Sequence, residues 1–556
     1  MPIDCVLVAS SLSPGNSSDM TATALPHNVK GGALLELDGA SLTIRDALEV
    51  SRRNRTVQLS DHAAEAVRAS CNLKHELIDR EIPIYGVTTG FGDSAHRQIA
   101  PAKASQLQQN IMRFMGVGTG PIAPPEVARV TMLLRANTLS KGNSGVRVEL
   151  IERVLDLLNH DVTPYIFERG SCGASGDLAP LSYVGKALAG DGRVLFAGTD
   201  RDAAGVLAEL GLEPFLLEAK EGLALTNGTS FMSAFACLAV GAARELADLC
   251  DLMTAMASEA LLGNRGHFNS FLFDEAKPHP GMVTCARHIR ELLADSQLAA
   301  DSDELFPGGL DGAGFRELDR HVQDKYSIRC APHVNGVLRD VLDWVSQWIE
   351  IEINSSDDNP LFNVAGGRVE SGGNFYGGHM GQAMDSLKVA LANLCDLIDR
   401  QLELVVDEKF NRGLTANLIQ RFEPDHPEAG LNHGFKGLQL CASAMTAEAM
   451  HLCAPTTIHS RSTEAHNQDK VSMGTIAARD ARSIVELAQN IAAIHLMACC
   501  QALELRGVEK ASPRTQEAVR RVREHVPFLD RDRYLDEDIA TTVALIQSGA
   551  MSGLLG

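Results

Sequence analysis

A long apolar stretch of the chain reads 231-FMSAFACLAVGAARELADLCDLMTAMASEALLG-263. Its many Ala and Leu residues are strong helix formers, so the sequence predicts one long helix over roughly 231–262 that ends at Gly263. Four charged side chains fall between positions 244 and 251, inside the stretch. A helix buried in a protein core therefore explains this composition better than a membrane span.

Working outward, further segments share this helix-forming composition. They are 126–139, 149–159, 336–352, 379–406, 436–453 and 476–506. Helices of about 25–30 residues exceed the globular average of about 12, which favours long rods packed as a bundle. Aromatic residues make up only 5% of the chain, whereas strands favour aromatic and β-branched side chains. We therefore expect a mainly all-α fold built around a long-helix bundle.

The composition also limits the class of protein. Of 556 residues, 45% are hydrophobic and 22% charged, so a large core is feasible and global disorder is excluded. A formal net charge of -21 argues against nucleic-acid binding, which needs clustered Lys and Arg. The 12 cysteines form no CxxC pair, and the N-terminus has neither a basic start nor a long apolar run. We expect free thiols, no membrane association and a cytoplasmic location.

The domain organisation follows from where composition changes. Residues 1–33 accumulate Ser, Asn, Gly and Pro without an apolar period, which predicts a mobile N-terminal tail. No repeat or low-complexity linker divides the remainder, so we expect residues 34–556 to form one globular unit. Within it we distinguish an N-terminal region over 34–225, a long-helix region over 226–506 and a helical C-terminal segment over 507–556.

Glycine-rich strings lie between the predicted helices, where loops would carry the chemistry. They are 85-YGVTTGFG-92, 169-RGSCGASGDL-178, 226-TNGTS-230 and 370-ESGGNFYGG-378. Familiar motifs are missing: Pro121 occupies the third glycine position of a GxGxxG loop, and the sequence has no HExxH or paired CxxC. We expect neither a nucleotide nor a metal.

The segment 170-GSCGASGDLAPL-181 has two interpretations. It can be a tight turn before a helix with Asp177 as the N-cap. It also permits unusual chemistry, because the bare amide of Gly176 can approach the carbonyl of Ala174. Loss of two waters, one of them from Ser175, would close a five-membered ring with an exocyclic methylene, an electrophile that no standard side chain provides.

With this segment and eight others, the sequence resembles the aromatic amino acid ammonia-lyase and aminomutase family, which includes histidine, tyrosine and phenylalanine ammonia-lyases. The resemblance covers nearly the whole chain after residue 34. The motifs that carry it are 85-YGVTTGFG-92, 172-CGASGDLAPLS-182, 220-KEGLALTNGTS-230, 277-KPHPG-281, 323-QDKYSIR-329, 353-INSSDDNPL-361, 372-GGNF-375, 430-GLNHGFKGLQ-439 and 467-NQDKVSMG-474.

The resemblance implies a cofactor, a fold and an assembly. Ala174, Ser175 and Gly176 would cyclise to 4-methylideneimidazole-5-one (MIO), with no metal or nucleotide. The fold would be the long-helix bundle of the ammonia-lyase/fumarase-like superfamily, with several helix N-termini aimed at MIO. The protein would be a homotetramer in which three subunits build each active site around a small amino acid substrate.

Three residues would carry the main roles. Tyr85 matches the family's catalytic tyrosine, which removes the β-hydrogen; since a phenol has a pKa of about 10, it needs nearby positive charge or donors. Tyr326 matches the second family tyrosine, which a neighbouring subunit places near the leaving amine. Arg329 matches the arginine that holds the substrate carboxylate, a task that suits its planar bidentate fork.

Other positions match substrate-binding residues of the family. They are Gln323, spaced to share one helical stripe with Tyr326 and Arg329; Asn227, which would support the MIO oxygen; Asn374; Phe375, beside the MIO ring; and Glu448, near the amine.

Two positions concern the substrate. Phe114 and Met115 fall where the family carries its selector pair, and they offer an apolar wall without a hydrogen-bond partner. Burying a tyrosine hydroxyl there unpaired would cost about 1–3 kcal/mol. Gln468 stands where histidine enzymes have Glu. The alternative is that Phe114 and Met115 are ordinary core residues.

The sequence therefore predicts a phenylalanine ammonia-lyase that yields trans-cinnamate. Three departures leave room for other substrates: His333 replaces the usual Gln, Met450 replaces a Lys or Arg, and Lys470 lies beside Gln468. Tyrosine or histidine ammonia-lyase activity stays an alternative, as does an aromatic 2,3-aminomutase using the same residues. The remote alternative is an inactive helical scaffold.

Overall fold

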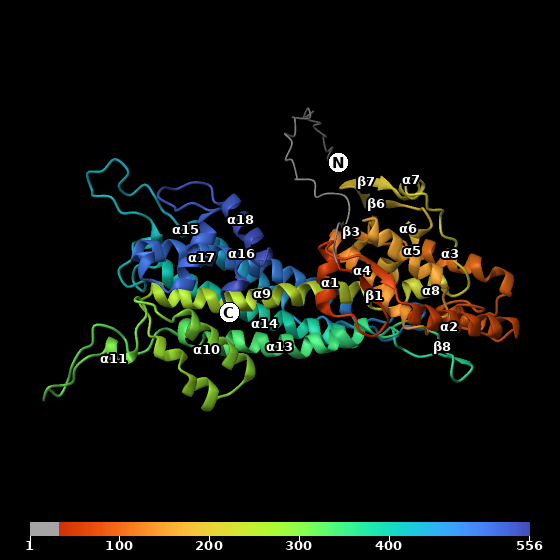
Figure 1. Cartoon of the computed structure of the whole chain (residues 1–556), viewed down its shortest axis with the longest axis horizontal. Coiled ribbons are helices and arrows are strands. Elements are labelled where there is room, and N and C mark those ends of the chain that lie inside the picture. Colours follow the sequence, from red (N-terminus) through yellow and green to blue (C-terminus); the bar gives the residue numbers. More distant parts are fainter. Residues whose placement is uncertain (1–32, 556) are drawn as a thin grey trace, which may run out of the picture.

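The computed structural model describes residues 33–555, so almost all of the predicted tail over 1–33 lies outside the described residues. Four long helices lie side by side along the long axis of the molecule (Figure 1). They are α9 (Ser230–Ala260), α13 (Ala331–Ile353), α14 (Gly378–Val406) and α16 (Gly474–Arg506). The expected mainly all-α bundle is confirmed.

The long helices form because their apolar side chains have a continuous core to enter. Almost every residue of α9 from Ser230 to Ala243 is buried, and α16 is buried over most of its length. Both helices are long and apolar enough to cross a membrane, but 78% of the most apolar window of each is buried within the molecule. Core helices share this composition, so it is weak evidence of a membrane span.

All seven predicted helices are present, and most begin and end within two residues of the expected positions. The largest difference is α13, which starts at Ala331 rather than at 336. Pro332 lies in its first turn, where a proline costs no intrahelical hydrogen bond because those N–H groups have no partner in any case.

The N-terminal region packs shorter helices and small sheets at one end of the bundle (Figure 1). Its helices are α1 (Ile44–Ser51), α2 (Asp61–Asp79), α3 (Ala104–Met115), α4 (Pro125–Ser140), α5 (Val148–Asn159), α6 (Leu178–Leu188), α7 (Ala203–Glu209) and α8 (Glu221–Thr226). Its strands are β1 (Leu35–Leu37), parallel to β2 (Val57–Leu59); β3 (Thr119–Ile122), antiparallel to β5 (Phe167–Arg169); and the antiparallel set β4 (Thr163–Pro164), β6 (Arg193–Phe196) and β7 (Thr199–Asp202).

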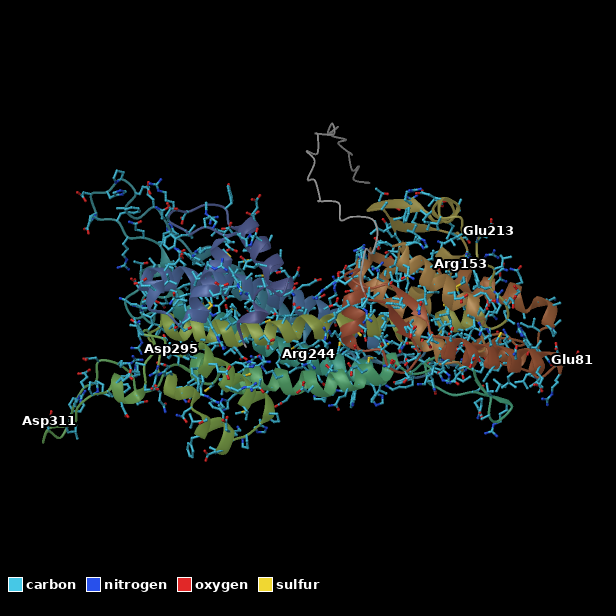
Figure 2. All side chains as sticks on the ribbon, viewed as in Figure 1. Glu81, Arg153, Glu213, Arg244, Asp295 and Asp311 are labelled. Carbon is cyan, nitrogen blue, oxygen red and sulfur yellow. The ribbon has the colours of Figure 1, made fainter. Side chains whose placement is uncertain are left out.

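The other α-helices and strands lie around the long helices, except for the last hairpin, which packs against α2. They are α10 (Pro280–Leu292), α11 (Ser302–Leu305), α12 (Tyr326–Arg329), α15 (Lys436–Leu452), α17 (Pro513–Arg523), α18 (Asp536–Gln547) and the antiparallel hairpin β8 (Leu361–Asn363) with β9 (Arg368–Glu370). The segment between α11 and α12 extends away from the body, with Asp311 near its tip (Figure 2). Glu81, just after α2, lies at the opposite end of the molecule (Figure 2).

Candidate active site

The tripeptide Ala174-Ser175-Gly176 lies in a tight loop just before α6. Ser175 and Gly176 both have left-handed backbone conformations, with φ of 55° and 78°. A side chain on Gly176 would overlap the carbonyl oxygen of Gly228, so only glycine fits. Asn227 Nδ2 donates a 2.7 Å hydrogen bond to the Ser175 carbonyl, and its buried Oδ1 has no partner within residues 33–555. The loop therefore fits the predicted MIO ring, which needs a folded backbone, a bare glycine and polar support.

Asp177 connects this loop to two long helices through hydrogen bonds of its side chain. Its buried carboxylate accepts hydrogen bonds from Met232 N in the first turn of α9 (2.8 Å), from Ser171 Oγ (2.9 Å) and from Thr475 Oγ1 at the start of α16. Asp177 does occupy the N-cap position of α6, but its side chain makes no capping bond there. Burial raises the pKa of Asp177 to about 6. Three helix N-termini thus meet at the tripeptide, as the resemblance implied.

A buried ion pair supports Asn227 from behind. Arg135 Nη1 donates to the Asn227 carbonyl at 2.8 Å, while Arg135 Nη2 pairs with the carboxylate of Asp357. Asp357 also accepts the backbone N–H of Thr229 at 2.8 Å. Removing one partner of a buried pair typically costs about 3–5 kcal/mol, so this network holds Asn227 firmly against the tripeptide.

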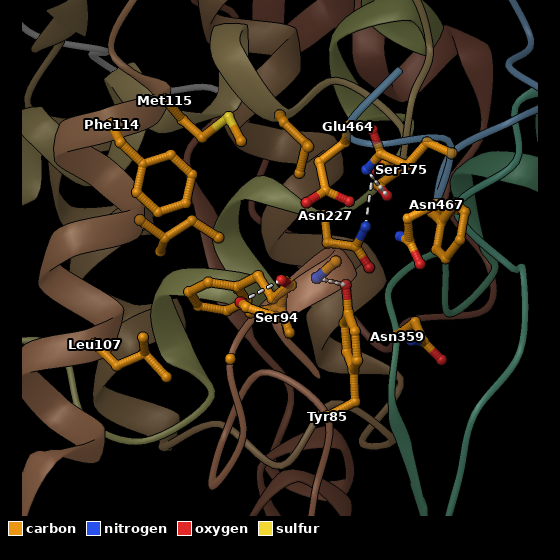
Figure 3. A pocket seen from close by; sticks show the side chains of 18 of the residues that line it. Tyr85, Ser94, Leu107, Phe114, Met115, Ser175, Asn227, Asn359, Glu464 and Asn467 are labelled. Atoms are coloured by element: carbon orange, nitrogen blue, oxygen red, sulfur yellow. Dashed lines mark hydrogen bonds between the residues drawn. The ribbon is translucent and has the colours of Figure 1, made fainter. Parts of the chain in front are cut away.

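A cavity of about 830 Å³ opens at Ser175 (Figure 3). It brings together seven of the predicted site residues, namely Tyr85, Phe114, Met115, Ser175, Asn227, Phe375 and Gln468. Asn374, next to Phe375, donates from Nδ2 to the Ser356 carbonyl at 3.1 Å and does not line the cavity. The predicted residues therefore converge from six separate segments of the chain.

Tyr85 enters this cavity from the glycine-rich loop after α2 (Figure 3). Its phenol oxygen accepts a 2.9 Å hydrogen bond from the backbone N–H of Gly92. Burial raises the pKa of Tyr85, the Gly92 N–H opposes this, and the carboxylate of Glu464 raises the pKa further. The expected donor is present, but the charged group that acts on Tyr85 within the described chain is an anion rather than a cation.

Glu464 is a cavity residue that the sequence analysis missed. Both of its carboxylate oxygens accept the backbone N–H of Asp93, at 3.0 and 3.1 Å. Glu464 and the two residues after it have left-handed backbone conformations, in the loop before α16 that also carries Gln468. Gln468 Nε2 in turn donates to Ser175 Oγ at 3.0 Å. The signal available in the sequence was an acidic residue just before the motif 467-NQDKVSMG-474.

The apolar wall of the cavity comes from one face of α3. Leu107, Ile111, Phe114 and Met115 recur at helical spacing and line the cavity together (Figure 3). Phe91 lies across from them, with its ring 6.1 Å from that of Phe114. Phe114 is 49% exposed, so it is a cavity residue and not an ordinary core residue.

Four predicted site residues lie elsewhere in the subunit. Tyr326 and Arg329 are the first and last residues of α12, which precedes the 23-residue helix α13. Asp357, near the tripeptide, follows α13. At 1.5 Å per residue, α13 separates the two groups by about 35 Å. Gln323 precedes α12, so the expected helical stripe is wrong. Glu448 is exposed on α15, away from the cavity.

The three departures from the family pattern have different surroundings. Lys470 lines the cavity, so it can act on a bound molecule. His333 packs against Phe273, with ring centres 5.4 Å apart, and burial lowers the pKa of His333. Met450 is 42% exposed on α15. Residues 33–555 contain no cluster of three or more His, Cys, Asp and Glu side chains arranged to hold a metal ion.

Comparison with known proteins places these features in context. The family model described as "Aromatic amino acid lyase" matches residues 42–524. The histidine ammonia-lyase of Gloeobacter violaceus is 40% identical over 515 residues, covering 93% of this chain and 96% of that protein. The tyrosine ammonia-lyase of Cupriavidus metallidurans is 39% identical over 521 residues, covering 93% and 96%. The crystal structure of tyrosine aminomutase from Streptomyces globisporus superposes with a TM-score of 0.89 at 36% identity, covering 94% of this chain and 98% of that one.

Proposed function

Since this chain belongs to the aromatic amino acid lyase family, whose named members are ammonia-lyases and aminomutases of amino acids, we propose that it converts L-phenylalanine to trans-cinnamate and ammonia. Ala174, Ser175 and Gly176 would form MIO, which supplies a carbon electrophile for the substrate amine. The observation that carries the substrate assignment is the cavity at Ser175, to which α3 contributes four apolar side chains and one amide, that of Asn110.

Tyr85 removes the β-proton in this proposal. It lines the same cavity as Ser175 and Asn227, and its phenol oxygen already accepts the Gly92 N–H. Because burial raises the pKa of Tyr85, the tyrosinate becomes abundant only at alkaline pH or when a cation approaches. A positioned base with a high pKa suits the weakly acidic β-hydrogen.

The charged groups of the amino acid need partners of opposite sign. Glu464 is a carboxylate in the cavity, and we assign it the substrate ammonium. That ammonium would offset the negative charge that opposes formation of the tyrosinate. Arg329 is assigned the substrate carboxylate, but it lies at the far end of α13. We therefore propose that a second copy of the chain supplies it, which supports an oligomer with shared active sites, and the homotetramer stays our proposal.

The ring of the substrate faces Leu107, Ile111, Phe114 and Met115. These side chains offer no hydrogen-bond partner, so they favour phenyl over a ring that carries a polar group. An unpaired buried hydroxyl costs about 1–3 kcal/mol, which corresponds to about ten- to a hundredfold in selectivity.

Tyrosine is the second candidate, and one residue favours it. Asn110 also lines the cavity, one turn of α3 before Phe114, and its amide could pair with a hydroxyl at the edge of the apolar wall. The likeness to tyrosine ammonia-lyase and tyrosine aminomutase supports the same candidate. A 2,3-aminomutase would use the same residues and return the amine to the β-carbon.

Product analysis tests these assignments. The purified full-length protein is incubated separately with L-phenylalanine, L-tyrosine and L-histidine at alkaline pH, and all products are identified by mass spectrometry. We expect cinnamate as the main product and phenylalanine as the best substrate. Coumarate or urocanate without cinnamate would contradict the substrate assignment, and β-phenylalanine as the main product would identify an aminomutase.

We propose a cytoplasmic location for this protein. All eleven cysteines within residues 33–555 are free, which supports our proposal of a reducing, cytoplasmic environment.

A further inference from the structure

Gln401, a fully buried residue of α14, connects four helices through its side-chain amide. Its Nε2 donates to Thr254 Oγ1 of α9 and to the backbone carbonyl of Ser327 in α12, both at 2.9 Å. Its Oε1 lies 3.2 Å from Nε2 of His495 on α16. The amide therefore links the bundle core to the short helix that carries Tyr326 and Arg329.

The direction of these bonds follows from the chemistry of the partners. His495 is fully buried, and burial lowers its pKa to about 3, so its ring is neutral at physiological pH. An amide oxygen can only accept a hydrogen bond, so Nε2 of His495 carries the proton that faces Gln401. That bond orients the amide, and both N–H groups of Gln401 then point at acceptors. The Ser327 carbonyl therefore receives a donor with a fixed position.

The helix that receives this bond depends on tertiary contacts for its position. α12 has only four residues, and a single helical turn gains too few hydrogen bonds to be stable alone. Tyr326 is 72% exposed, whereas Ile328 of the same turn is 2% exposed and packs into the core, so α12 is anchored by Ile328 and by hydrogen bonds to its backbone. Among residues 33–555, no other side chain donates to a backbone carbonyl of α12. Gln401 thus adds a directional hydrogen bond to the apolar contact of Ile328, and this bond fixes the orientation of the turn.

Tyr326 and Arg329 form one surface on the outer side of α12. The guanidinium of Arg329 lies over the Tyr326 ring, 4.5 Å from its centre, and Arg329 Nε donates to the Asp324 carbonyl at 3.1 Å. Both side chains therefore move together with the backbone of α12. A shift of that backbone would displace the guanidinium and the phenol as a pair.

We propose that Gln401 is a positioning residue, which fixes α12 so that Arg329 and Tyr326 reach the active site of a neighbouring copy in the correct geometry. The proposal rests on the proposed function, in which Arg329 binds the substrate carboxylate. It predicts that loss of the Gln401 amide weakens recognition of the carboxylate while leaving the tripeptide unaffected, because the α12 turn and the tripeptide lie at opposite ends of α13.

The test uses two competitive inhibitors of the full-length enzyme. 3-Phenylpropanoate has a carboxylate and no amine, whereas 2-phenylethylamine has an amine and no carboxylate. Gln401→Met keeps the length of the side chain and removes its amide. We expect the inhibition constant of 3-phenylpropanoate to rise at least about tenfold, the scale of a weakened charge-assisted contact, while that of 2-phenylethylamine changes less than about twofold. The Gln401→Met protein should still be lighter than its sequence by two waters, because MIO formation at the tripeptide does not involve Gln401.

A matched control separates positioning from loss of stability. Gln501 of α16 is also buried and its Nε2 also has two acceptors, here the backbone carbonyls of Leu418 (3.1 Å) and Leu529 (2.8 Å), neither of them in α12. Gln501→Met should leave both inhibition constants unchanged. Two results would show that the positioning role is wrong. One is that Gln501→Met changes the inhibition constant of 3-phenylpropanoate as strongly as Gln401→Met does. The other is that Gln401→Met changes the inhibition constants of both inhibitors equally.

Two further variants complete the design. If Gln401→Met does not fold, Gln401→Asn replaces it. The shorter side chain keeps its amide but cannot reach the same three partners. The same changes in the two inhibition constants are expected for Gln401→Asn, and the same results would contradict the proposal. Arg329→Met serves as the reference. If Arg329→Met leaves 3-phenylpropanoate binding unchanged, the proposed carboxylate site is wrong, and the positioning role fails with it. If only Arg329→Met weakens binding, the carboxylate site stands and the role of Gln401 is overturned.

Discussion

Tyr85 and Glu464 are bound to adjacent peptide groups of one turn. The phenol oxygen of Tyr85 accepts the N–H of Gly92 at 2.9 Å, and the carboxylate of Glu464 accepts the N–H of Asp93 at 3.0 Å. The proposed base is therefore held close to an anion that disfavours its ionised form. The same anion is a suitable partner for an incoming ammonium, so substrate binding and activation of the base are coupled in this arrangement.

The pH dependence should reveal this coupling. Burial and Glu464 raise the pKa of Tyr85 above its usual value near 10, and the base works only when deprotonated, so kcat/KM should rise with pH into the alkaline range. Glu464→Gln removes the anion, which lowers the pKa of Tyr85. We expect the acidic limb of the profile to move to lower pH, even though maximal activity falls.

Asp469 provides the control for that experiment. It lines the same cavity as Glu464 and is a carboxylate of the same loop, but it is not among the groups that shift the pKa of Tyr85. Asp469→Asn should leave the acidic limb in place. An unchanged limb in Glu464→Gln would mean that Tyr85 is not the group whose ionisation limits the rate.

Measurement of the intact mass tests whether Ala174, Ser175 and Gly176 form the MIO ring. The matured chain should be lighter than its sequence by two waters, and Ser175→Ala should restore the full mass and lower activity by at least about a thousandfold. Cys172→Ala changes the same loop outside the tripeptide and should keep the deficit. Full activity in Ser175→Ala would refute the assignment of MIO.

Gly176 gives an independent test of the loop geometry. A Cβ at this position would overlap the carbonyl of Gly228, so Gly176→Ala should prevent ring closure and show the full mass. Gly198 has a similar φ of 73° with nothing within 4 Å of its would-be Cβ. Gly198→Ala should lose about 1 kcal/mol of stability and keep the mass deficit. A two-water deficit in Gly176→Ala would show that the overlap does not control cyclisation.

Phe114 should control the preference for phenylalanine over tyrosine. Phe114→His places a hydrogen-bond partner in the apolar wall, so kcat/KM for tyrosine relative to phenylalanine should rise about ten- to a hundredfold. Val117 follows α3 and does not line the cavity, so Val117→His should leave the ratio unchanged. A ratio that is unaffected by Phe114→His would place the ring of the substrate elsewhere.

The sequence by itself was sufficient for the helices and for the tripeptide. Each long helix is encoded locally, because its helix-forming composition extends over the whole segment, as in 231–262 and 379–406. The candidate tripeptide is also found locally, since Ala174, Ser175 and Gly176 are consecutive, although Asn227 and Gly228 shape the loop that holds it.

The tertiary structure decided which distant groups share the cavity and which do not. Glu464 meets Asp93 across 371 positions of sequence, and that approach depends on how two loops pack, so no local pattern encodes it. Likewise, the length of α13 keeps Arg329 away from Ser175 in the same subunit, which agrees with the expectation that neighbouring subunits share each active site. Helix formation is governed by near neighbours along the chain, whereas an active site is assembled from loops whose separation is set by the rigid helices between them.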